Sequence, residues 1–280
     1  MHPVIRHILD RRGKKVPVHD GRKITLVLYS GIMTGVRGAG AMIALEDLGL
    51  SHAFDEIQTV SAGFANASYL LGDNTRPGTS IYYDDLAGGN FIKPWRIWKM
   101  ADINFVVHAT EVKKPLNVEA IKKTHTKLYV RLLNVSTRKN EYLEIHDLFH
   151  IKYHDILKAA IYMQYMAPGT VSINGTRYMD GWFTSNDSIE FVNHALASDA
   201  TDILIIYNRR DQRAKEIPLS DRVCEILPEP EWKLSSLETN SEKLKHATIQ
   251  MGTLVKKTFG IDEPISLAYN DARVSNFNAN

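Results

Sequence analysis

The feature that most constrains the fold of this chain is a repeated order of buried strand, small-residue turn and apolar helix. Residues 24–29, Ile-Thr-Leu-Val-Leu-Tyr, are short, apolar and β-branched, which is typical of a buried strand. A glycine-bearing loop over 30–35 and an apolar helix over 36–48 follow. The same order returns as a strand over 54–60 and a helix over 62–71. Strands that alternate with helices predict a parallel sheet covered by helices.

The rest of the chain adds elements of both types. The pattern predicts strands over 127–135, 141–145 and 202–207, a hairpin turning at Asn174-Gly175, and helices over 147–166, 187–196 and 243–259. Asp147 stands where the N-cap of its helix would lie. Residues 72–90 are rich in turn-forming residues and predict a surface excursion, a candidate lid or mouth. Together these elements predict a single α/β domain with a parallel-rich central sheet sandwiched between helices.

The domain organisation follows from length and local charge. A chain of 280 residues forms one large domain or two small ones, and no convincing boundary divides this one. We expect a basic N-terminal segment over 1–23, one domain over 24–260 and a C-terminal tail over 261–280. The first segment holds seven Lys and Arg residues against two Asp residues. We interpret it as a solvated arm or a surface helix, with contact to anionic lipid headgroups as the alternative.

Composition excludes several classes of function. Lys and Arg total 34 and Asp and Glu total 32, so nothing indicates a nucleic-acid partner. Cys224 is the single cysteine, which rules out an intramolecular disulfide and a Cys-rich zinc site. No apolar run approaches the ~20 residues of a membrane span, and the first residues lack a signal-peptide core. The expected location is cytoplasmic, with any membrane contact peripheral. Trp95 and Trp98 are candidates for lipid contact or for core packing.

Ser61 directly follows the second predicted strand and precedes the second helix. A serine on a sharp strand-to-helix turn projects its hydroxyl away from the sheet, at a helix N-terminus that favours a developing anion. Ala62 and Gly63 are small enough for such a turn, whereas Thr59 is larger than the glycine usual there. Two interpretations stay open on this pentapeptide alone, a nucleophile and a simple helix N-cap.

Two other segments bear on the role of Ser61. The loop over 30–35 ends a strand at the same edge of the sheet, so its N–H groups could bind an oxyanion formed on attack by Ser61. Its glycines do not follow the G-x-G-x-x-G spacing, which makes a dinucleotide-binding loop a weaker interpretation. The absence of G-K-[ST] excludes a P-loop. Asp180-Gly181 ends a predicted strand, either as a plain turn or as an acid that orients or deprotonates Ser61.

In this order, the segments resemble the patatin-like phospholipase family. That family shows a glycine-rich oxyanion loop, a buried helix, a G-x-S-x-G serine elbow and a distant Asp-Gly. The corresponding stretches here are 30–35 for the loop, 39–50 for the helix, 59–63 for the elbow, 178–181 for Asp-Gly and 200–205 for the strand after it. The resemblance is dense over 24–71 and 168–207 and loose between them.

The resemblance implies a patatin-like fold and a serine lipid acyl hydrolase. Ser61 would be the nucleophile and Asp180 its general base, a pair that needs no histidine. Backbone amides of Gly31, Ile32 and Ala62 would form the oxyanion hole. The partner would be a phospholipid or another lipid ester, cleaved by a phospholipase A-type or lysophospholipase-type reaction. No metal and no organic cofactor are implied.

Several positions depart from the family pattern. Ile32 replaces a loop glycine, Thr34 an Arg or Lys, Thr59 the first glycine of the elbow, and Trp182 the glycine after Asp-Gly. These departures favour an altered or narrowed pocket. They also motivate a first alternative, a degenerate patatin-like protein that binds or assembles without turnover.

Two further alternatives rest on other features. A nucleotide-binding α/β protein remains a rival that the glycine spacing weakens. His146, His150 and His154 are spaced four residues apart, so on one helix they would line a face and could ligate a metal. No H-E-x-x-H pattern accompanies them, and a polar helix face is the plainer interpretation.

Overall fold

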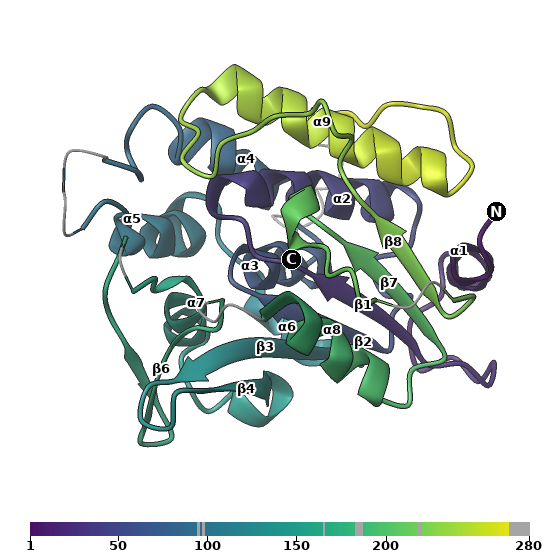
Figure 1. Ribbon diagram of the computed structural model, residues 1–280, viewed down its shortest axis with the longest axis horizontal. Helices are drawn as coiled ribbons and strands as arrows, with labels where there is room; N and C mark the ends of the chain where they lie inside the picture. Colours follow the sequence, from purple (N-terminus) through teal and green to yellow (C-terminus); the bar gives the residue numbers. More distant parts are fainter. Residues whose placement is uncertain (94–95, 97–98, 165, 183–186, 218–219, 269–280) are drawn as a thin grey trace, which may run out of the picture.

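The computed structural model describes residues 1–93, 96, 99–164, 166–182, 187–217 and 220–268 (Figure 1). Over these residues the chain forms an eight-stranded mixed sheet in the order β5-β6-β3-β2-β1-β7-β8, with β4 paired to β3. Five strands are parallel: β1 (Ile24–Leu28), β2 (Glu56–Val60), β3 (Lys127–Asn134), β7 (Asp202–Ile206) and β8 (Val223–Ile226). Three are antiparallel: β4 (Lys139–Glu144), β5 (Val171–Ile173) and β6 (Thr176–Asp180). The predicted α/β class and parallel-rich sheet are confirmed.

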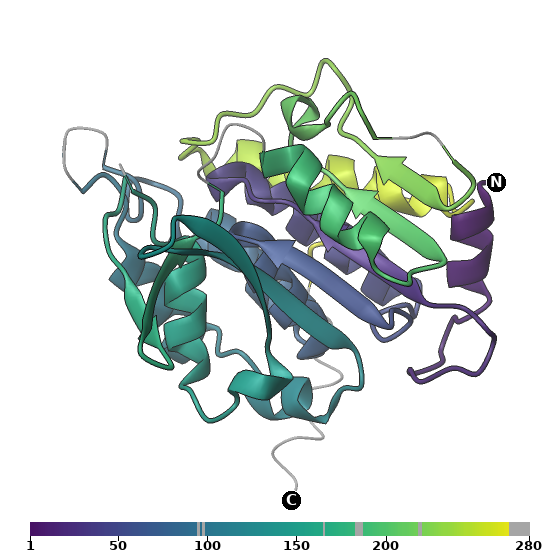
Figure 2. The same cartoon turned by 60° about the horizontal axis from the view of Figure 1, so that its bottom comes forward.

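Helices cover both faces of the parallel part of the sheet (Figures 1 and 2). One face carries α2 (Val36–Asp47), α3 (Ala62–Leu71) and α9 (Ser241–Thr258), and the other carries α8 (Asp187–Ala197). Alternate residues of β1 divide between two buried clusters: Leu26 and Leu28 join the first face, and Val27 joins Phe191 of α8. Because both faces are buried, β1 reads as a continuous apolar run.

The first helix after β1 is buried because another helix packs across it. A Cβ on Gly40 of α2 would lie 2.2 Å from the backbone O of Thr248 on α9. The two helix backbones therefore approach closely enough to require glycine at this crossing. Figure 1 shows α9 above α2, with α4 (Thr75–Ser80) beside them.

The basic N-terminal segment folds onto the protein. Its helix α1 (Pro3–Leu9) buries Val4, Ile5 and Ile8 in the core. The Arg11 side chain is fully buried and bonds Asp20 at 2.8 Å and Asp55 at 2.6 Å. The hydrogen bond from Arg11 lowers the pKa of Asp20 to about 2, so this ion pair persists at acidic pH.

Two segments differ from the sequence-based expectation. The helix expected over 147–166 is replaced by a 3₁₀ turn η4 (His146–Leu148) and a shorter helix α7 (Tyr153–Ile161), so Asp147 is not its N-cap. The chain is extended at Lys152 (φ −60°, ψ 120°), which separates the two pieces. Residues 72–90 form α4 and the π-helix η2 (Ile81–Asp85), whose Ile81, Tyr82 and Tyr83 are buried. The predicted surface excursion is therefore wrong for this stretch.

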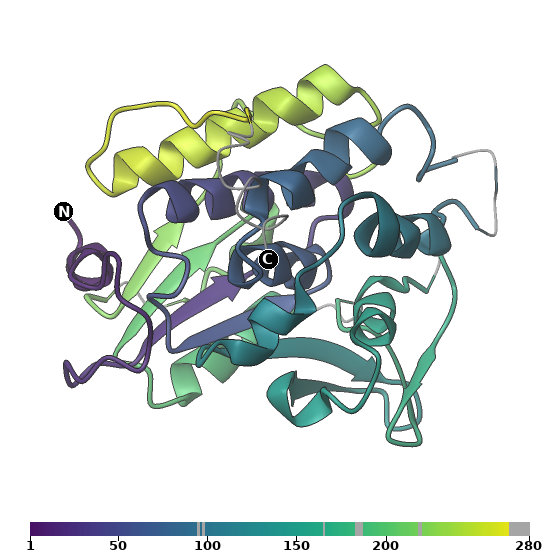
Figure 3. The same cartoon turned by 180° about the vertical axis from the view of Figure 1, so that it is seen from behind.

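Three further short helices were not predicted, and they lie near α7 and α3, on the side of the protein seen in Figure 3. They are α5 (Ile103–His108), the π-helix η3 (Ala109–Lys113) and α6 (Val118–Lys123). No helix in the described part of the chain combines the length and apolarity that crossing a membrane requires. Trp95, Trp98 and the end of the tail after 268 lie outside the described residues.

Candidate active site

Ser61 occupies a strained turn between β2 and α3. Its backbone has φ 55° and ψ −126°, a conformation that L-residues rarely adopt and that costs about 1–3 kcal/mol. The side chain forms no capping hydrogen bond to the helix. The structure therefore contradicts the simple N-cap interpretation. Strain of this kind is found where a turn must present a side chain at a functional site.

Small residues around Ser61 allow the turn. A Cβ on Gly63 would lie 2.5 Å from the O of Leu28, so α3 packs against β1 only with glycine there. Thr59, which replaces the elbow's first glycine, is buried, and its Oγ1 donates to the O of Tyr129 at 2.6 Å. The threonine at this position is accommodated because its hydroxyl bonds β3 from β2, and the Ser61 turn still forms.

The loop after β1 turns through the short 3₁₀ helix η1 (Ile32–Gly35). The Thr34 Oγ1 donates to the O of Gly31 at 2.7 Å, and a Cβ on Gly31 would lie 2.5 Å from the N of Gly35. Among the described residues, the amide N–H groups of Gly31, Ile32 and Ala62 donate no hydrogen bond to the protein. They are therefore available to a ligand oxygen.

Two asparagines hold this loop from outside. The Asn208 amide donates to the O of Tyr29 and of Ser30, both at 2.8 Å, and its Oδ1 accepts from the N of Gly38 at 2.7 Å. The Asn66 amide donates to the O of Gly35 at 2.9 Å. These bonds fix the loop through its carbonyl groups.

Asp180 is the last residue of β6 and is 2% exposed. Its N donates to the O of Tyr162 at 3.0 Å, and its Oδ1 accepts from the N of Trp182 at 3.1 Å. A Cβ on Gly181 would lie 2.6 Å from the O of Arg131, so the Asp-Gly sequence lets β6 end close against β3. Trp182, which departs from the family pattern, packs edge-on against Tyr29 at 5.7 Å between ring centroids.

The sheet register brings the ends of β2 and β6 together. Arg131 of β3 pairs with Val60 and with Tyr142, and the next residue, Leu132, pairs with Asp180 and with Glu141. Since β4 occupies one side of β3, β2 and β6 share the other side, and their carboxyl ends meet there. Val60, which precedes Ser61, and Asp180 therefore pair with consecutive residues of β3. Consecutive residues of a strand are about 3.3 Å apart along its axis.

No hydrogen bond joins the Ser61 hydroxyl to the Asp180 carboxylate, both of which belong to described residues. Catalytic hydrogen bonds are often long before substrate binds, or pass through one water. The sequence-based assignment of nucleophile and base therefore stays a prediction.

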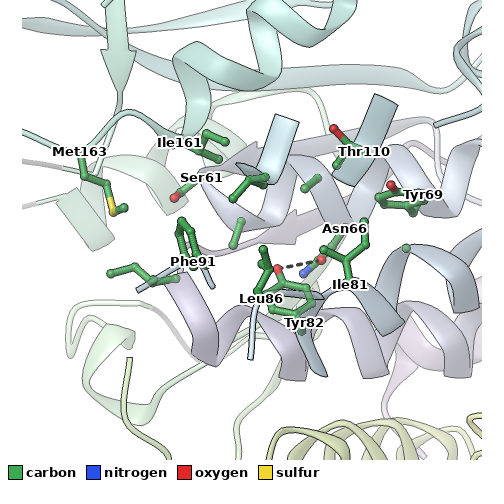
Figure 4. A pocket seen from close by; sticks show the side chains of 15 residues that line it. Ser61, Asn66, Tyr69, Ile81, Tyr82, Leu86, Phe91, Thr110, Ile161 and Met163 are labelled. Atoms are coloured by element: carbon green, nitrogen blue, oxygen red, sulfur yellow. Dashed lines mark hydrogen bonds between the residues drawn. The ribbon is translucent and has the colours of Figure 1, made fainter. Parts of the chain in front are cut away.

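An apolar pocket opens beside Ser61 (Figure 4). It is narrow, with a volume of about 60 Å³. Ser61 lies toward one end in the view of Figure 4, and Tyr69 lies toward the other. Apolar side chains make up most of the wall: Ile32, Ile81, Leu86, Phe91, Ile161 and Met163.

Apart from Ser61, the polar groups along this pocket are bonded to the protein. The Tyr82 hydroxyl donates to the Oδ1 of Asn66 at 3.2 Å, the Tyr69 hydroxyl to the O of Lys114 at 2.5 Å, and the Thr110 hydroxyl to the O of Val107 at 2.9 Å. Burial raises the pKa of the Tyr82 phenol, which stays neutral. The pocket suits an alkyl chain rather than a polar ligand.

Sequence reasoning named residues 72–90 as a candidate lid or mouth, and part of this stretch lines the pocket, but other parts of the wall were missed. Ile81, Tyr82 and Leu86 come from the stretch expected at the surface, and Val106 and Thr110 from the unpredicted α5 and η3. The one available signal was the apolar run Ile81-Tyr82-Tyr83, which turn residues on both sides obscured.

The three histidines do not form a common site. His146 lies in η4 and bonds the O of Thr124 at 3.0 Å, whereas His154 lies in α7 and bonds the O of Thr110 at 3.2 Å. His150 lies between these elements and bonds the Oδ1 of Asn174 at 2.8 Å. The described residues contain no group of three metal-ligating side chains.

Comparison with known proteins gives structural similarity only at a distance. No protein-family model matches the sequence, and no curated protein matches it. Among solved structures, VipD from Legionella pneumophila is similar with a TM-score of 0.42 and 10% sequence identity, over 84% of this chain and 67% of that chain. Similarity this distant carries no information about activity.

Proposed function

We propose that this protein is a serine hydrolase that cleaves acyl esters of phospholipids or related lipids. The observation that carries the proposal is the strained, uncapped Ser61 in the wall of an apolar pocket. A serine that only capped a helix would adopt an extended backbone and bond the helix N–H groups. The apolar wall favours a substrate with an acyl chain.

In the proposed reaction, Ser61 Oγ attacks the ester carbonyl and transfers its proton to the Asp180 carboxylate, directly or through one water. The oxyanion accepts hydrogen bonds from the amides of Gly31, Ile32 and Ala62. Asp180 then returns the proton to the leaving alkoxide, and water hydrolyses the acyl-enzyme by the reverse transfers. The ends of β2 and β6 on the same side of β3 support this pairing.

The lipid surface would contact the protein at η3. Val112 in this element is 62% exposed, and its neighbour Thr110 lines the pocket. A large apolar side chain in water beside the pocket suits peripheral contact with a lipid surface, from which an acyl chain enters.

A fluorophosphonate probe tests the proposed nucleophile. We expect wild type to be labelled at Ser61, to release fatty acid from short-chain phospholipids, and to keep that activity in EDTA. Peptide mapping after labelling, with Ser68→Ala as a control serine on the same helix, identifies the modified residue. Labelling elsewhere, or no labelling together with no hydrolysis, would instead favour a binding or assembly role, which the departures at Ile32, Thr34 and Thr59 motivate.

Ile32 is expected to limit the acyl chain that the pocket accepts. Its φ of 50° is unfavourable for a β-branched residue, and its side chain lines the pocket. Ile32→Gly should relieve the strain and widen the pocket, raising kcat/KM for longer acyl esters relative to short ones by roughly tenfold. Ile32→Val, which stays β-branched, is the matched control. An unchanged chain-length profile in Ile32→Gly would show that other residues set this limit.

A further inference from the structure

A second cavity lies at the carboxyl ends of β7 and β8. It has a volume of about 550 Å³ and is bordered by the turn after β7, the segment after β8 and the start of α9. β1 and β7 are neighbours, yet the chain continues from β1 toward β2 and from β7 toward β8. Ligands of open α/β sheets bind outside such a switch point, at the carboxyl ends of the strands.

Basic side chains dominate the wall of this cavity. Five of them contribute: Arg37, Arg209, Arg210, Lys233 and Lys243. The lining also includes three acids, Asp211, Glu229 and Glu238.

Two of the three acids are engaged within the wall. Asp211 pairs with Arg209 at 3.0 Å, and Glu238 lies 3.6 Å from Lys243 while accepting from the N of Thr239 and of Asn240. Each of these contacts also engages a cation of the wall. Counted over the whole lining, five basic and three acidic side chains leave an excess of two positive charges.

Arg37 is the most informative of the cations because it is buried. It is 3% exposed, and its guanidinium donates to the O of Asn208 at 2.8 Å and to the O of Trp232. Its Nε has no hydrogen-bond partner, and no carboxylate of the described residues pairs with it. A buried charge without a counter-ion is unfavourable unless an anion compensates it.

We infer that this cavity is a binding site for a phosphate group. Guanidinium groups bind phosphate oxygens through paired, charge-assisted hydrogen bonds, and lysines add charge at the rim. The buried Arg37 would compensate the negative charge of the phosphate from the interior side of the cavity. Arg209, Arg210 and Lys233 would compensate it from the open side. The group can belong to a free phosphate compound or to a lipid headgroup, and both present the same oxygens.

The site is distinct from the pocket of Ser61, although the loop after β1 borders one and the helix α2 that follows it borders the other. Ile32 lines the apolar pocket, and Arg37, five residues later, lines the basic cavity. The N of Met33 donates to the O of Ser236, whose Oγ accepts from Arg209. Phosphate binding should therefore also stabilise the segment after β8.

Calorimetric titration of the full chain with inorganic phosphate and with glycerol 3-phosphate, at constant ionic strength, tests the inference. We expect one site, and a Kd at least about tenfold higher in the double variant Arg209→Gln/Lys233→Gln. A parallel arm measures binding to phosphatidylcholine vesicles with and without phosphatidic acid. The control Lys122→Gln/Lys123→Gln removes the same charge from α6 and should change neither measurement more than about twofold.

The outcomes separate the two sources of phosphate. If wild type binds soluble phosphate and the double variant does not, the site takes free phosphate compounds. If wild type binds only vesicles that contain phosphatidic acid, and the double variant does not bind them, the site takes a lipid headgroup. Arg37→Gln, if its circular dichroism is native, should lose binding as well. The inference is overturned if neither probe binds, or if the control variant loses as much as the double variant. Neither measurement requires that the protein hydrolyse lipid.

Discussion

Replacing Ser61 with alanine is expected to lower the rate of lipid-ester hydrolysis by about 10³-fold or more and to abolish fluorophosphonate labelling. Asp180→Asn keeps the shape of the side chain but removes the proton acceptor, because an amide is not a base at neutral pH. It should therefore cost a similar factor. Since both groups act in one step, the double variant should be little worse than either single one. Initial rates on a short-chain phospholipid measure all three.

The control for these variants is Asn66→Ala, which removes the bond that supports the loop at Gly35 and the bond from Tyr82, without touching the predicted proton path. It should reduce the rate less than Ser61→Ala does. If Asp180→Asn keeps nearly the wild-type rate, Asp180-Gly181 is only the turn that ends β6. The base must then be sought elsewhere, and His108 at the end of α5 is the first residue to test.

The first strand–helix–strand–helix unit could be predicted because its signals are local. Ile24–Leu28 is apolar except for Thr25, and α3 runs from Ala62 to Leu71 as the sequence indicates. Both elements are buried, so burial and local pattern agree. The unusual backbone of Ser61 also has a local cause, because Ala62 and Gly63 permit a turn that larger residues would block.

The position of Asp180 could be predicted only in part. The sequence indicates the hairpin that contains β6, since Asn174-Gly175 takes positive φ angles of 49° and 81°. It does not indicate that β6 joins β3 on the side where β2 ends. That arrangement depends on the pairing of Leu132 with Asp180, a contact between residues 48 positions apart.

The basic cavity illustrates a different limit of sequence analysis. Arg37 stands two residues after Gly35, the last residue of the loop that follows β1. The structure directs it to the backbone of Asn208 and Trp232, which come from two distant segments. The burial of Arg37 without an acid partner depends on how distant segments pack, so no sequence pattern around residue 37 could predict it.

Gly63→Ala is expected to damage both stability and activity. An added Cβ would lie 2.5 Å from the O of Leu28, so α3 must move away from β1. Overpacking of this kind costs about 1–3 kcal/mol of unfolding free energy, and moving the Ser61 turn by ~1 Å lowers the rate roughly 100-fold. Urea unfolding and initial rates test both.

Gly21→Ala is the control, because Gly21 lies far from the site. Its φ of 73° means that an alanine would strain the backbone, but the added Cβ would meet nothing within 4 Å. It should therefore lose about 1 kcal/mol and keep its activity. A Gly63→Ala protein that is destabilised yet fully active would show that the α3–β1 contact does not position the nucleophile.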